Sequence, residues 1–532
     1  MLTQICVLTQ ICYLLQQIIS RPVCRYFAGF LQILLKRETC QSYSWSGNLY
    51  SILQPQKQYF IHSKTLFTII ICNICTTRSL FGETLIDFKN CENVLQTKNA
   101  PIVNSLNKRP RFAELFTQFD FVDNQPNCKD KCIFNINTPA NVFMSQTSNT
   151  FHSLLKQLSP YQYMNRIPGS TAFSKDILAH AVNYQMQFAP LNLTPDTFIL
   201  PEHKNKVLQM KNQTVIQKPI NGMKGKGIKI GTVDQIDLNM SSVVQIYENT
   251  LLYNKHKFDL RYYVLITSVD PLICYYYQNG DVRVAKKLYT ESNFDDPQIH
   301  LTNGYVNNQN EDANYKTDSG DFGSFNTSTL FKYLEQSPRI FGQDSINTTQ
   351  LQLKIEETIT KTLISVYPEL VHFSKPVRLH RFPKTMFQIF GFDLFITPEL
   401  DVKLFEVNTN PGFYRVNNIH PDFNGNEVVN DALQLIGVRI NVNESNINIP
   451  VLNQKDLFIK ETYTKEEDLE LIDYSSATIF EKKCVQQIMD EETRIGGFTR
   501  IKFENYLNEF RDGTALTNTV YKIVQQGLPI VE

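Results

Sequence analysis

Hydrophobic and polar residues alternate along the middle of the chain in a way that predicts short strands separated by loops. Apolar runs over residues 264–268, 273–277 and 404–407 have the length and the β-branched and aromatic content of buried strands. Residues 349–367 instead repeat apolar positions at helical spacing, which predicts a helix whose buried face comprises Leu351, Ile355, Ile359, Leu363 and Val366. Strands and helices mixed in this order indicate an α+β fold, with α/β as the alternative.

The same pattern divides the chain into three parts. Residues 1–105 are rich in Cys and Ile and carry no motif that indicates chemistry, so we interpret them as an N-terminal extension of unknown role. Residues 106–430 hold the strand-rich pattern and predict the main domain, which the resemblance described below implies to be the catalytic domain. Residues 431–532 contain charged helical patterns, among them 465–474 and 481–494, and predict a largely helical C-terminal region.

Two segments stand apart from this pattern. The first twenty residues are apolar, but glutamines interrupt them and no basic residue precedes them, so they match neither a signal peptide nor a membrane-spanning helix. We therefore expect no association with a membrane. Residues 309–328 are rich in Asn, Asp, Ser and Gly without an apolar period and predict a mobile loop.

Composition narrows the class of protein. Lys and Arg together number 52, as do Asp and Glu, so no whole-protein field favours a nucleic acid, and we expect no nucleic-acid partner. The 11 cysteines are odd in number and scattered, which argues against a disulfide framework and favours a reducing compartment.

A glycine-rich basic loop follows an apolar run at residues 215–230, VIQKPINGMKGKGIKI. Glycines let a backbone approach a ligand closely, and lysines supply the positive charge that a polyphosphate needs. The residues that could serve in this way are Lys218, Gly222, Lys224, Gly225, Lys226 and Gly227. A plain hairpin turn with solvated lysines is the alternative, because the loop lacks the ending of a Walker A motif.

A second charged pattern enters an apolar strand at KFDLRYYVLI, residues 257–266. Lys257, Asp259 and Arg261 alternate, so a strand would place all three on one face. Cations facing one cleft suit a reaction that transfers phosphate, whereas a solvated strand face is the alternative. Downstream come Arg283, after a turn at Asn279-Gly280, and the polar string HLTN at 300–303, which alone could be a capped turn.

A third pattern, FQIFGFDLFITPELDVKLFEVNTNP at residues 387–411, carries Asp393 on one apolar segment and Glu406 and Asn408 on the next. Two strands joined by a turn over residues 397–401 would bring these three side chains together. Oxygen ligands of this kind are what Mg²⁺ on a nucleotide requires. Structural carboxylates buried beside arginines are the alternative.

Taken in order, these segments resemble the tubulin-tyrosine-ligase-like family. The resemblance begins at NRIPGSTAFSKDIL and LTPDTFILP and continues through KPINGMKGKGI, VVQIYENTLL, KFDLRYYVLITSVDPL, HLTN, GFDLF and EVNTNP, over roughly residues 165–412. EETRIGGFTRI at 491–501 resembles an element that follows the core in many members. The resemblance implies an ATP-grasp-type ligase fold that uses ATP and Mg²⁺.

The resemblance also implies roles for individual residues. ATP would be bound by the residues Lys175, Lys218, Lys224, Gly225, Lys226, Gly227, Ile228, Gln245, Ile246, Tyr247, Lys257 and Asp259. The phosphate and acceptor side would comprise Arg261, Arg283, His300, Leu301, Thr302 and Asn303. Asp393, Glu406 and Asn408 would hold the metal. The catalytic residues would be Lys257, Arg261, Arg283 and Glu406.

By the same resemblance, the expected activity is transfer of glutamate to side-chain carboxylates of tubulin C-terminal tails through an acyl phosphate, because glutamate ligases are the most numerous branch. A glycine ligase is the first alternative, since EVNTNPGF departs from the common ending beside the metal. Tyrosine addition comes third. Expected partners are tubulin or microtubules and a free amino acid, glutamate or glycine, and the expected location is the cytoplasm and the microtubule cytoskeleton, at a cilium or basal body.

An inactive microtubule-binding scaffold is the alternative from another class. Such a protein would have lost one of the residues that the chemistry needs, yet all five are present: Lys218, Arg261, Asp393, Glu406 and Asn408.

Overall fold

The computed structural model describes parts of the unit Gln96–Glu532, the larger of the two units into which the chain divides. The described residues are 102–105, 122–123, 142–144, 163–188, 192–308, 316–320, 323–342, 344–374, 386–413, 425–437, 477–509 and 514–526. The extension predicted over residues 1–105 therefore lies outside the described residues, apart from its last four.

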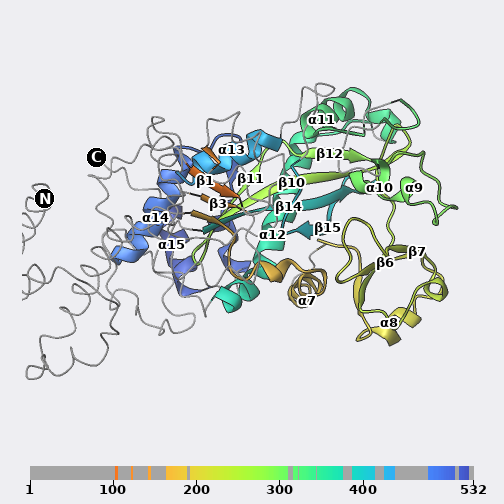
Figure 1. Cartoon of the computed structure of the whole chain (residues 1–532), viewed down its shortest axis with the longest axis horizontal. Coiled ribbons are helices and arrows are strands. Elements are labelled where there is room, and N and C mark those ends of the chain that lie inside the picture. Colours follow the sequence, from red (N-terminus) through yellow and green to blue (C-terminus); the bar gives the residue numbers. More distant parts are fainter. Residues whose placement is uncertain are drawn as a thin grey trace, which may run out of the picture. The chain divides into compact units, whose positions relative to one another are not determined.

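A large mixed sheet forms the centre of this unit (Figure 1). Its strands are β1 (Ile102–Ser105), β2 (Val122–Asp123), β3 (Val142–Met144), β4 (Tyr163–Asn165), β9 (Leu252–Tyr253), β10 (His256–Val269), β11 (Leu272–Tyr277), β12 (Asp281–Val284), β13 (Ser324–Asn326), β14 (Met386–Ile396), β15 (Val402–Asn408) and β16 (Phe498–Arg500). The order is β13-β12-β10-β14-β4-β3-β1-β2, and β11 and β9 also pair with β10, β15 with β14 and β16 with β11. Pairing is antiparallel around β10 and parallel from β14 through β4 to β2.

Strand β10 is the axis of this sheet. Its apolar and charged residues alternate, so one face joins the hydrophobic core and the other carries charge. On the core face, Tyr262 is fully buried and its hydroxyl reaches Gln352 at 3.1 Å. On the other face, Lys257, Asp259 and Arg261 are also buried, so the alternative of a solvated strand face is wrong.

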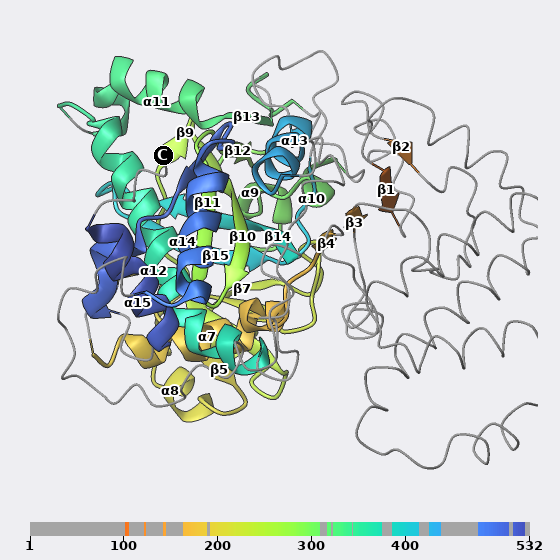
Figure 2. The same cartoon turned by 90° about the vertical axis from the view of Figure 1, so that its left-hand side faces the viewer.

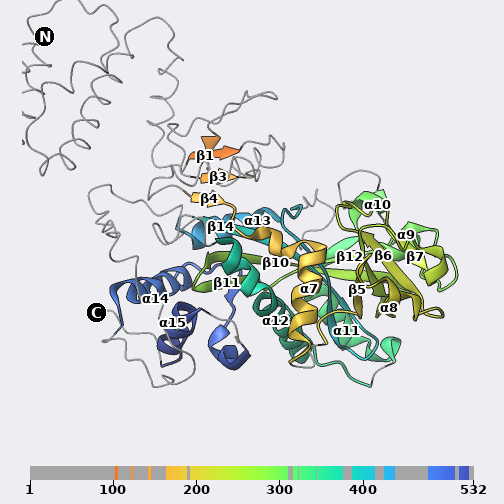
Figure 3. The same cartoon turned by 90° about the horizontal axis from the view of Figure 1, so that it is seen from below.

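The helix expected over residues 349–367 is present and longer, as α12 (Thr348–Ser374). Its predicted apolar positions are buried, and it packs against α7 (Lys175–Gln185), which follows η1 (Ser170–Phe173) (Figure 3). Shorter helices border the sheet: α9 (Pro297–His300), α10 (Gly304–Asn308), α11 (Thr327–Gln336) and η3 (Pro338–Phe341).

A second, smaller sheet has four antiparallel strands, β5 (Thr197–Leu200), β6 (Val215–Pro219), β7 (Lys229–Gly231) and β8 (Ser242–Ile246). Their order is β5-β8-β6-β7, and α8 (Lys204–Leu208) and η2 (Val233–Gln235) accompany them. This sheet has a hydrophobic core of its own, made of Leu200, Val207, Val215, Val233, Ile236 and Val244. It forms the lobe at the lower right of Figure 1.

The last described elements pack near β11 and the end of α12 (Figure 2). They are α13 (Gly425–Leu435), α14 (Ile479–Glu492), η9 (Phe503–Glu509) and α15 (Ala515–Gln525). A capping box of Thr478 and Glu481 begins α14. Near its end, the buried carboxylate of Glu491 accepts hydrogen bonds from Thr267 at 2.8 Å, Tyr275 at 2.9 Å and Gln487 at 2.9 Å.

Most of the predicted elements that the structure describes are confirmed. The apolar runs at 264–268, 273–277 and 404–407 lie in β10, β11 and β15. The helical pattern at 481–494 lies largely in α14, whereas that at 465–474 is outside the described residues. The loop predicted over 309–328 is wrong at its end, because Ser324–Asn326 forms β13 and α11 begins at Thr327. Asn326 begins that helix by accepting the amide of Thr329, so a polar composition there reflects a helix cap.

Within the residues that the structure describes, no helix combines the length and the apolarity that crossing a bilayer requires.

Candidate active site

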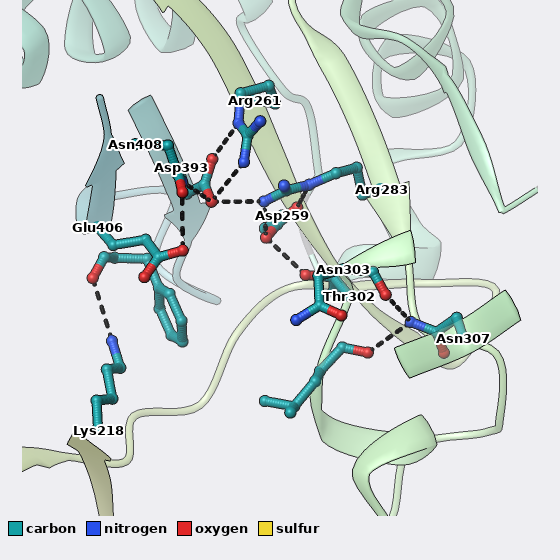
Figure 4. A network of polar contacts seen from close by, with 12 residues as sticks. Lys218, Asp259, Arg261, Arg283, Thr302, Asn303, Asn307, Asp393, Glu406 and Asn408 are labelled. Atoms are coloured by element: carbon teal, nitrogen blue, oxygen red, sulfur yellow. Dashed lines mark hydrogen bonds and ion pairs between the residues drawn. The ribbon is translucent and has the colours of Figure 1, made fainter. Parts of the chain in front are cut away.

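A buried network of carboxylates and arginines crosses the charged face of the large sheet (Figure 4). Arg261 on β10 lies opposite Asp393 on β14 in the strand register. Its Nε and Nη2 both donate to the carboxylate of Asp393, the second at 2.9 Å. Both residues are almost fully enclosed, at 4% and 3% exposure. Burial disfavours a charged carboxylate, but Arg261 and Arg283 outweigh it and lower the pKa of Asp393.

The neighbouring pair continues this network toward β12. Arg283 lies opposite Asp259 in the register and donates to it from Nε at 2.7 Å and also from Nη2. The same Nη2 lies 2.9 Å from Oδ2 of Asp393, so one arginine joins two carboxylates. Thr302 adds a hydrogen bond from its hydroxyl to Asp259 at 2.6 Å. The alternative of structural carboxylates beside arginines therefore describes Asp259 and Asp393 well.

A glycine makes room for the Arg261 side chain where it reaches β14. A Cβ at position 391 would lie 2.9 Å from Cδ of Arg261 and 2.9 Å from Cβ of Pro411. Neither distance is tolerable for a methyl group. The absence of a side chain at Gly391 therefore lets the arginine reach Asp393, two residues further along the strand.

The three predicted metal ligands lie together on the β14–β15 hairpin. Asp393 pairs with Glu406 in the register, and the Asn408 amide donates to Asp393 at 3.1 Å and to Glu406 at 3.3 Å. The turn predicted at 397–401 is present, closed by the hydrogen bond from the Thr397 amide to the Asp401 carbonyl at 2.8 Å. Among the described residues, half-buried Glu406 forms no ion pair, unlike Asp393.

A bulge in β15 brings the small sheet into contact with this hairpin. Register shifts between Asp393 and Leu394, so Phe405 is the extra residue on β15. The carbonyl of Phe405 accepts a hydrogen bond from Lys218 at 3.1 Å, and its ring lies 3.5 Å from the Lys218 ammonium. Lys218, on β6, also donates to Gln245 at 2.6 Å. Burial lowers the pKa of Lys218 to about 8, with Glu406 opposing the shift.

The glycine-rich segment joins β6 and β7 as an antiparallel hairpin whose Lys224 and Lys226 are exposed, as the hairpin-turn alternative predicts. Both ammonium groups face the ring of Tyr305 on α10, at 5.0 and 5.9 Å from its centroid. Gly225 has φ of +77°, and a Cβ there would lie 3.0 Å from the Asn303 amide. The loop thus touches the segment that carries HLTN.

Other predicted residues of this loop lie close by. Lys175 at the start of α7 donates to the Gly222 carbonyl at 2.9 Å. Gly227 adopts a φ of +76°, which favours glycine, and the Ile228 amide donates to Gly225 at 3.4 Å.

The HLTN string contains both a helix end and a cap. His300 ends α9, and Leu301 presents its carbonyl to the Asn307 amide group at 2.8 Å. Asn303 accepts the amide of Val306 at 2.9 Å and so caps α10. The capped-turn alternative is therefore confirmed, while Thr302 joins the carboxylate network.

Three residues predicted to bind ATP, Gln245, Ile246 and Tyr247, lie where the chain leaves the small sheet at the end of β8, and we call this segment the hinge. Gln245 and Ile246 are its last strand residues, and the Tyr247 side chain turns toward the large sheet, where its hydroxyl contacts Lys257 at 2.6 Å and His300 at 2.8 Å. Burial, together with the charge of Lys218, lowers the pKa of Lys257 to about 7.

A small cavity of about 30 Å³ lies where α7, the small sheet and β15 meet. Lys175, Lys218, Gln245 and Glu406 line it together with apolar side chains from the same elements. Charged and apolar side chains thus face the same space, which has room for about a water molecule.

Sequence reasoning missed two residues of this site. Asp281 on β12 is fully enclosed, and its Oδ2 has no hydrogen-bond partner among the described residues. Burial raises its pKa to about 7, against a hydrogen bond from Ser324 and the charges of Arg283 and Arg261. Its alternation with Arg283 in the sequence was a signal that could have placed both on one face. Phe405 gave no such signal, because its contact with Lys218 depends on the bulge.

The donor chemistry at the hairpin fits a divalent cation of the Mg²⁺ type. Glu406 offers a carboxylate with no ion pair among described residues, and Asn408 offers an amide oxygen next to it. Asp393 is already shared between two arginines, so it is the least available of the three. No group of three His, Cys, Asp or Glu residues that could hold a metal ion occurs in the described ranges, so a set at this hairpin depends on the amide of Asn408 as well as on carboxylates.

Comparison with known proteins places this site in a family. The sequence model of the tubulin-tyrosine ligase family matches residues 154–447, more than half of the chain. This chain belongs to the tubulin-tyrosine ligase family. The matched range of this ligase-family chain contains every predicted site residue, from Lys175 to Asn408. The segment EETRIGGFTRI at 491–501, which resembles an element that follows the core in many members, lies outside the matched range.

Several proteins similar in sequence to this chain are named tubulin polyglutamylases. It is 34% identical over 270 residues to tubulin polyglutamylase TTLL6 of Homo sapiens, covering 48% of this chain and 29% of that protein. It is 32% identical over 314 residues to tubulin polyglutamylase TTLL7 of Mus musculus, covering 55% and 33%. It is 32% identical over 273 residues to tubulin polyglutamylase TTLL5 of Homo sapiens, covering 48% and 20%. The matches thus span a third or less of the length of these relatives.

Proposed function

We propose that the chain is an ATP- and Mg²⁺-dependent ligase that adds glutamate to side-chain carboxylates of tubulin C-terminal tails. Membership in the tubulin-tyrosine ligase family supports the use of ATP, and the names of the relatives support glutamate and tubulin. The observation that carries the proposal is the meeting of Glu406, which has no ion pair among the described residues, with Lys218 across the cavity between the small sheet and β15.

The nucleotide site that we propose is of the ATP-grasp type, between the small sheet and the charged face of the large sheet. The adenine would lie against the apolar lining near α7 and the β8 hinge. The phosphates would extend toward Lys218 and Lys257, whose ammonium groups supply positive charge inside a low-dielectric site. Asp393, Glu406 and Asn408 would hold Mg²⁺, with Glu406 as the main ligand.

The proposed chemistry follows from the low reactivity of a carboxylate toward amines. A carboxylate does not acylate an amine, so the γ-phosphoryl group of ATP would first pass to it and give an acyl phosphate. The amine of the incoming amino acid then attacks the acyl carbon, and phosphate leaves. Mg²⁺ would offset negative charge on the transferring phosphoryl group.

The residues of this chain position the reactants and stabilise charge; none needs to act as a covalent nucleophile. Lys218 and Lys257 bind and orient the polyphosphate from two different sheets. Arg261 and Arg283 place their positive charges next to the transferring group. Asp393 and Asp259 fix the orientation of the two guanidinium groups. Preorganised groups of this kind lower a barrier because they need not reorient during the reaction.

The test is transfer of a labelled amino acid. The purified chain would be incubated with ATP, Mg²⁺ and tubulin, with labelled glutamate or labelled glycine in parallel, and with the Glu406→Gln variant as control. Label from glutamate that depends on ATP and on Glu406 supports the proposal. Label from glycine alone would make the chain a glycine ligase. Tubulin binding without transfer of either amino acid would favour the alternative that the chain is an inactive microtubule-binding scaffold.

A further inference from the structure

A chain of three polar side chains joins the hinge of the small sheet to Lys257. The Lys257 ammonium lies 2.6 Å from the Tyr247 hydroxyl, and that hydroxyl lies 2.8 Å from Nδ1 of His300. The other imidazole nitrogen, Nε2, lies 2.8 Å from the carbonyl oxygen of Asn293. The three members come from the hinge after β8, from β10 and from α9, so the chain spans separate elements.

The direction of each hydrogen bond in this series of side chains follows from its last member, the contact of His300 with the Asn293 carbonyl. A carbonyl oxygen only accepts hydrogen bonds, so Nε2 of His300 must carry the proton that it donates to Asn293. In the neutral imidazole Nδ1 then has a lone pair and accepts from the Tyr247 hydroxyl. The Tyr247 hydroxyl directs its proton toward His300, so its oxygen presents lone pairs to Lys257. Lys257 therefore donates one N–H and keeps two for a ligand.

Burial and packing hold this arrangement in one state. Lys257 and His300 are both almost fully enclosed, and the Lys257 ammonium also lies 3.8 Å from the centre of the Tyr247 ring. Phe294 packs against His300 at 5.2 Å and against Tyr247 at 5.9 Å between ring centres. Burial lowers the pKa of His300, and Lys257 lowers it too, so the ring is neutral near pH 7.

We propose that Tyr247 and His300 are positioning residues that orient the ammonium of Lys257 toward the phosphates of ATP, and that protonation of His300 undoes this orientation. The role of Lys257 as a phosphate ligand rests on the proposed function. Neither Tyr247 nor His300 needs to touch the nucleotide through its side chain. Each acts by fixing the proton direction of the next group.

Protonation matters because it reverses the hydrogen bond on which the chain depends. A second proton on His300 turns Nδ1 into a donor and places a positive charge near Lys257. The other titratable or charged groups that face His300 are Tyr247 from the hinge, Tyr289 from the segment before α9, and Asp296 at the start of α9. Of these only Asp296 favours the protonated ring. Because protonation makes Nδ1 a donor, low pH should weaken the orientation of the Lys257 ammonium by Tyr247.

The first test compares two tyrosine variants of the full chain for binding of ATP with Mg²⁺ by calorimetry. Tyr247→Phe keeps the ring and its packing but removes the hydroxyl, so the dissociation constant should rise about tenfold at pH 7. Tyr289→Phe is the matched control, because its ring lies in the same cluster and its hydroxyl makes no hydrogen bond within the described residues. Its effect should stay within about twofold.

The second test asks whether the two positioning residues act as one unit. His300→Ala should weaken binding about as much as Tyr247→Phe, and the double variant should be no weaker than either alone. The ratio of variant to wild-type dissociation constant should be larger at pH 7 than at pH 5.5, where it should approach one, because the wild type itself loses the arrangement in acid. Protonation of ATP affects both proteins and cancels in this ratio.

Several results would overturn the inference. Wild-type affinity in Tyr247→Phe, an equal loss in Tyr289→Phe, or a double variant whose losses multiply would each remove the positioning role. A ratio that does not change with pH would remove the role of His300 protonation. Melting curves of each variant exclude unfolding, and if Tyr247→Phe does not fold, the His300→Ala ratio against pH carries the test. A wild-type protein that binds no ATP would instead refute the proposed function.

Discussion

Strand β10 carries a buried polar network at each end, and the two differ in how completely their charges are compensated. At the far end, Glu491 accepts three hydrogen bonds, and nearby Arg500 pairs with Glu492 at 2.6 Å and with Glu504 at 2.7 Å. At the near end, Glu406 has no ion pair among the described residues, and burial lowers the pKa values of Lys218 and Lys257.

This difference separates stability from function. Buried charges that serve the fold are satisfied in place, because an unpaired one costs several kcal/mol. Groups that await a ligand stay under-compensated until the ligand arrives, and their pKa values are displaced for that reason. At the near end, Lys218 and Lys257 have these properties. Asp259 and Asp393 at the same end are satisfied by arginines, as Glu491 at the far end is satisfied by its three hydrogen bonds.

Glu406→Gln should give the largest effect on activity and the smallest on the fold. The substitution keeps shape and burial and removes the charge that would hold Mg²⁺, so turnover should fall by a factor of roughly 100 or more. The melting temperature of the metal-free protein should stay nearly unchanged. Both would be measured on one preparation across a magnesium titration, and near-normal activity at any magnesium concentration would remove Glu406 from the site.

Glu491→Ala should do the reverse. It leaves the hydroxyls of Thr267 and Tyr275 and the amide of Gln487 without their acceptor, which should lower the free energy of unfolding by about 3 kcal/mol. Urea unfolding measures this, and the magnesium concentration for half-maximal activity should not move. Glu491→Gln keeps one acceptor oxygen and should lose less. A change in magnesium dependence without a loss of stability would break the distinction between the two ends.

Lys218→Met should weaken nucleotide binding without a comparable loss of stability. The ammonium is buried and its charge is disfavoured there, so an apolar side chain of similar length removes that cost while leaving Gln245 without its donor. ATP affinity should fall at least about tenfold by calorimetry, and the free energy of unfolding should drop by less than about 1 kcal/mol. Unchanged ATP affinity would exclude Lys218 from the phosphate site.

The pH dependence of stability is the most gradual of these effects. Burial lowers the pKa of Lys257 from 10.5 to about 7, so above pH 7 the unfolded chain binds a proton that the folded chain has lost. Stability should therefore rise with pH between about 7 and 10, by at most about 1.4 kcal/mol per pH unit from this group. Nucleotide-free wild type and Lys257→Met would be compared by urea unfolding. Equal slopes would show that Lys257 stays charged in the fold.

Much of the candidate site could be predicted from spacing alone. Asp393, Glu406 and Asn408 were placed together because strands repeat every two residues and a turn joins the two segments, and the structure brings them within hydrogen-bond distance. Lys257, Asp259 and Arg261 share a face for the same reason. These predictions succeeded because each depends on local periodicity.

Contacts between distant strands could not be predicted in this way. Arg261 was expected to face a phosphate, yet its fork is held by Asp393, a pairing that depends on the register of β10 against β14. Phe405 reaches Lys218 only because a bulge turns it toward the small sheet. Tyr247 was expected to bind ATP, and its side chain contacts Lys257 and His300 instead of lining the cavity.

The space that Gly391 leaves has a consequence for how this site can be inherited or transplanted. The arginine on β10 and the glycine on β14 lie far apart in the sequence, yet a methyl group on one would strike the side chain of the other. A recombination event or a loop graft that exchanged the β14–β15 hairpin as a block would keep the carboxylates and still fail unless it also delivered a glycine two positions before the aspartate. The hairpin and β10 therefore form one exchangeable unit, and any chimera of this chain should be cut outside both.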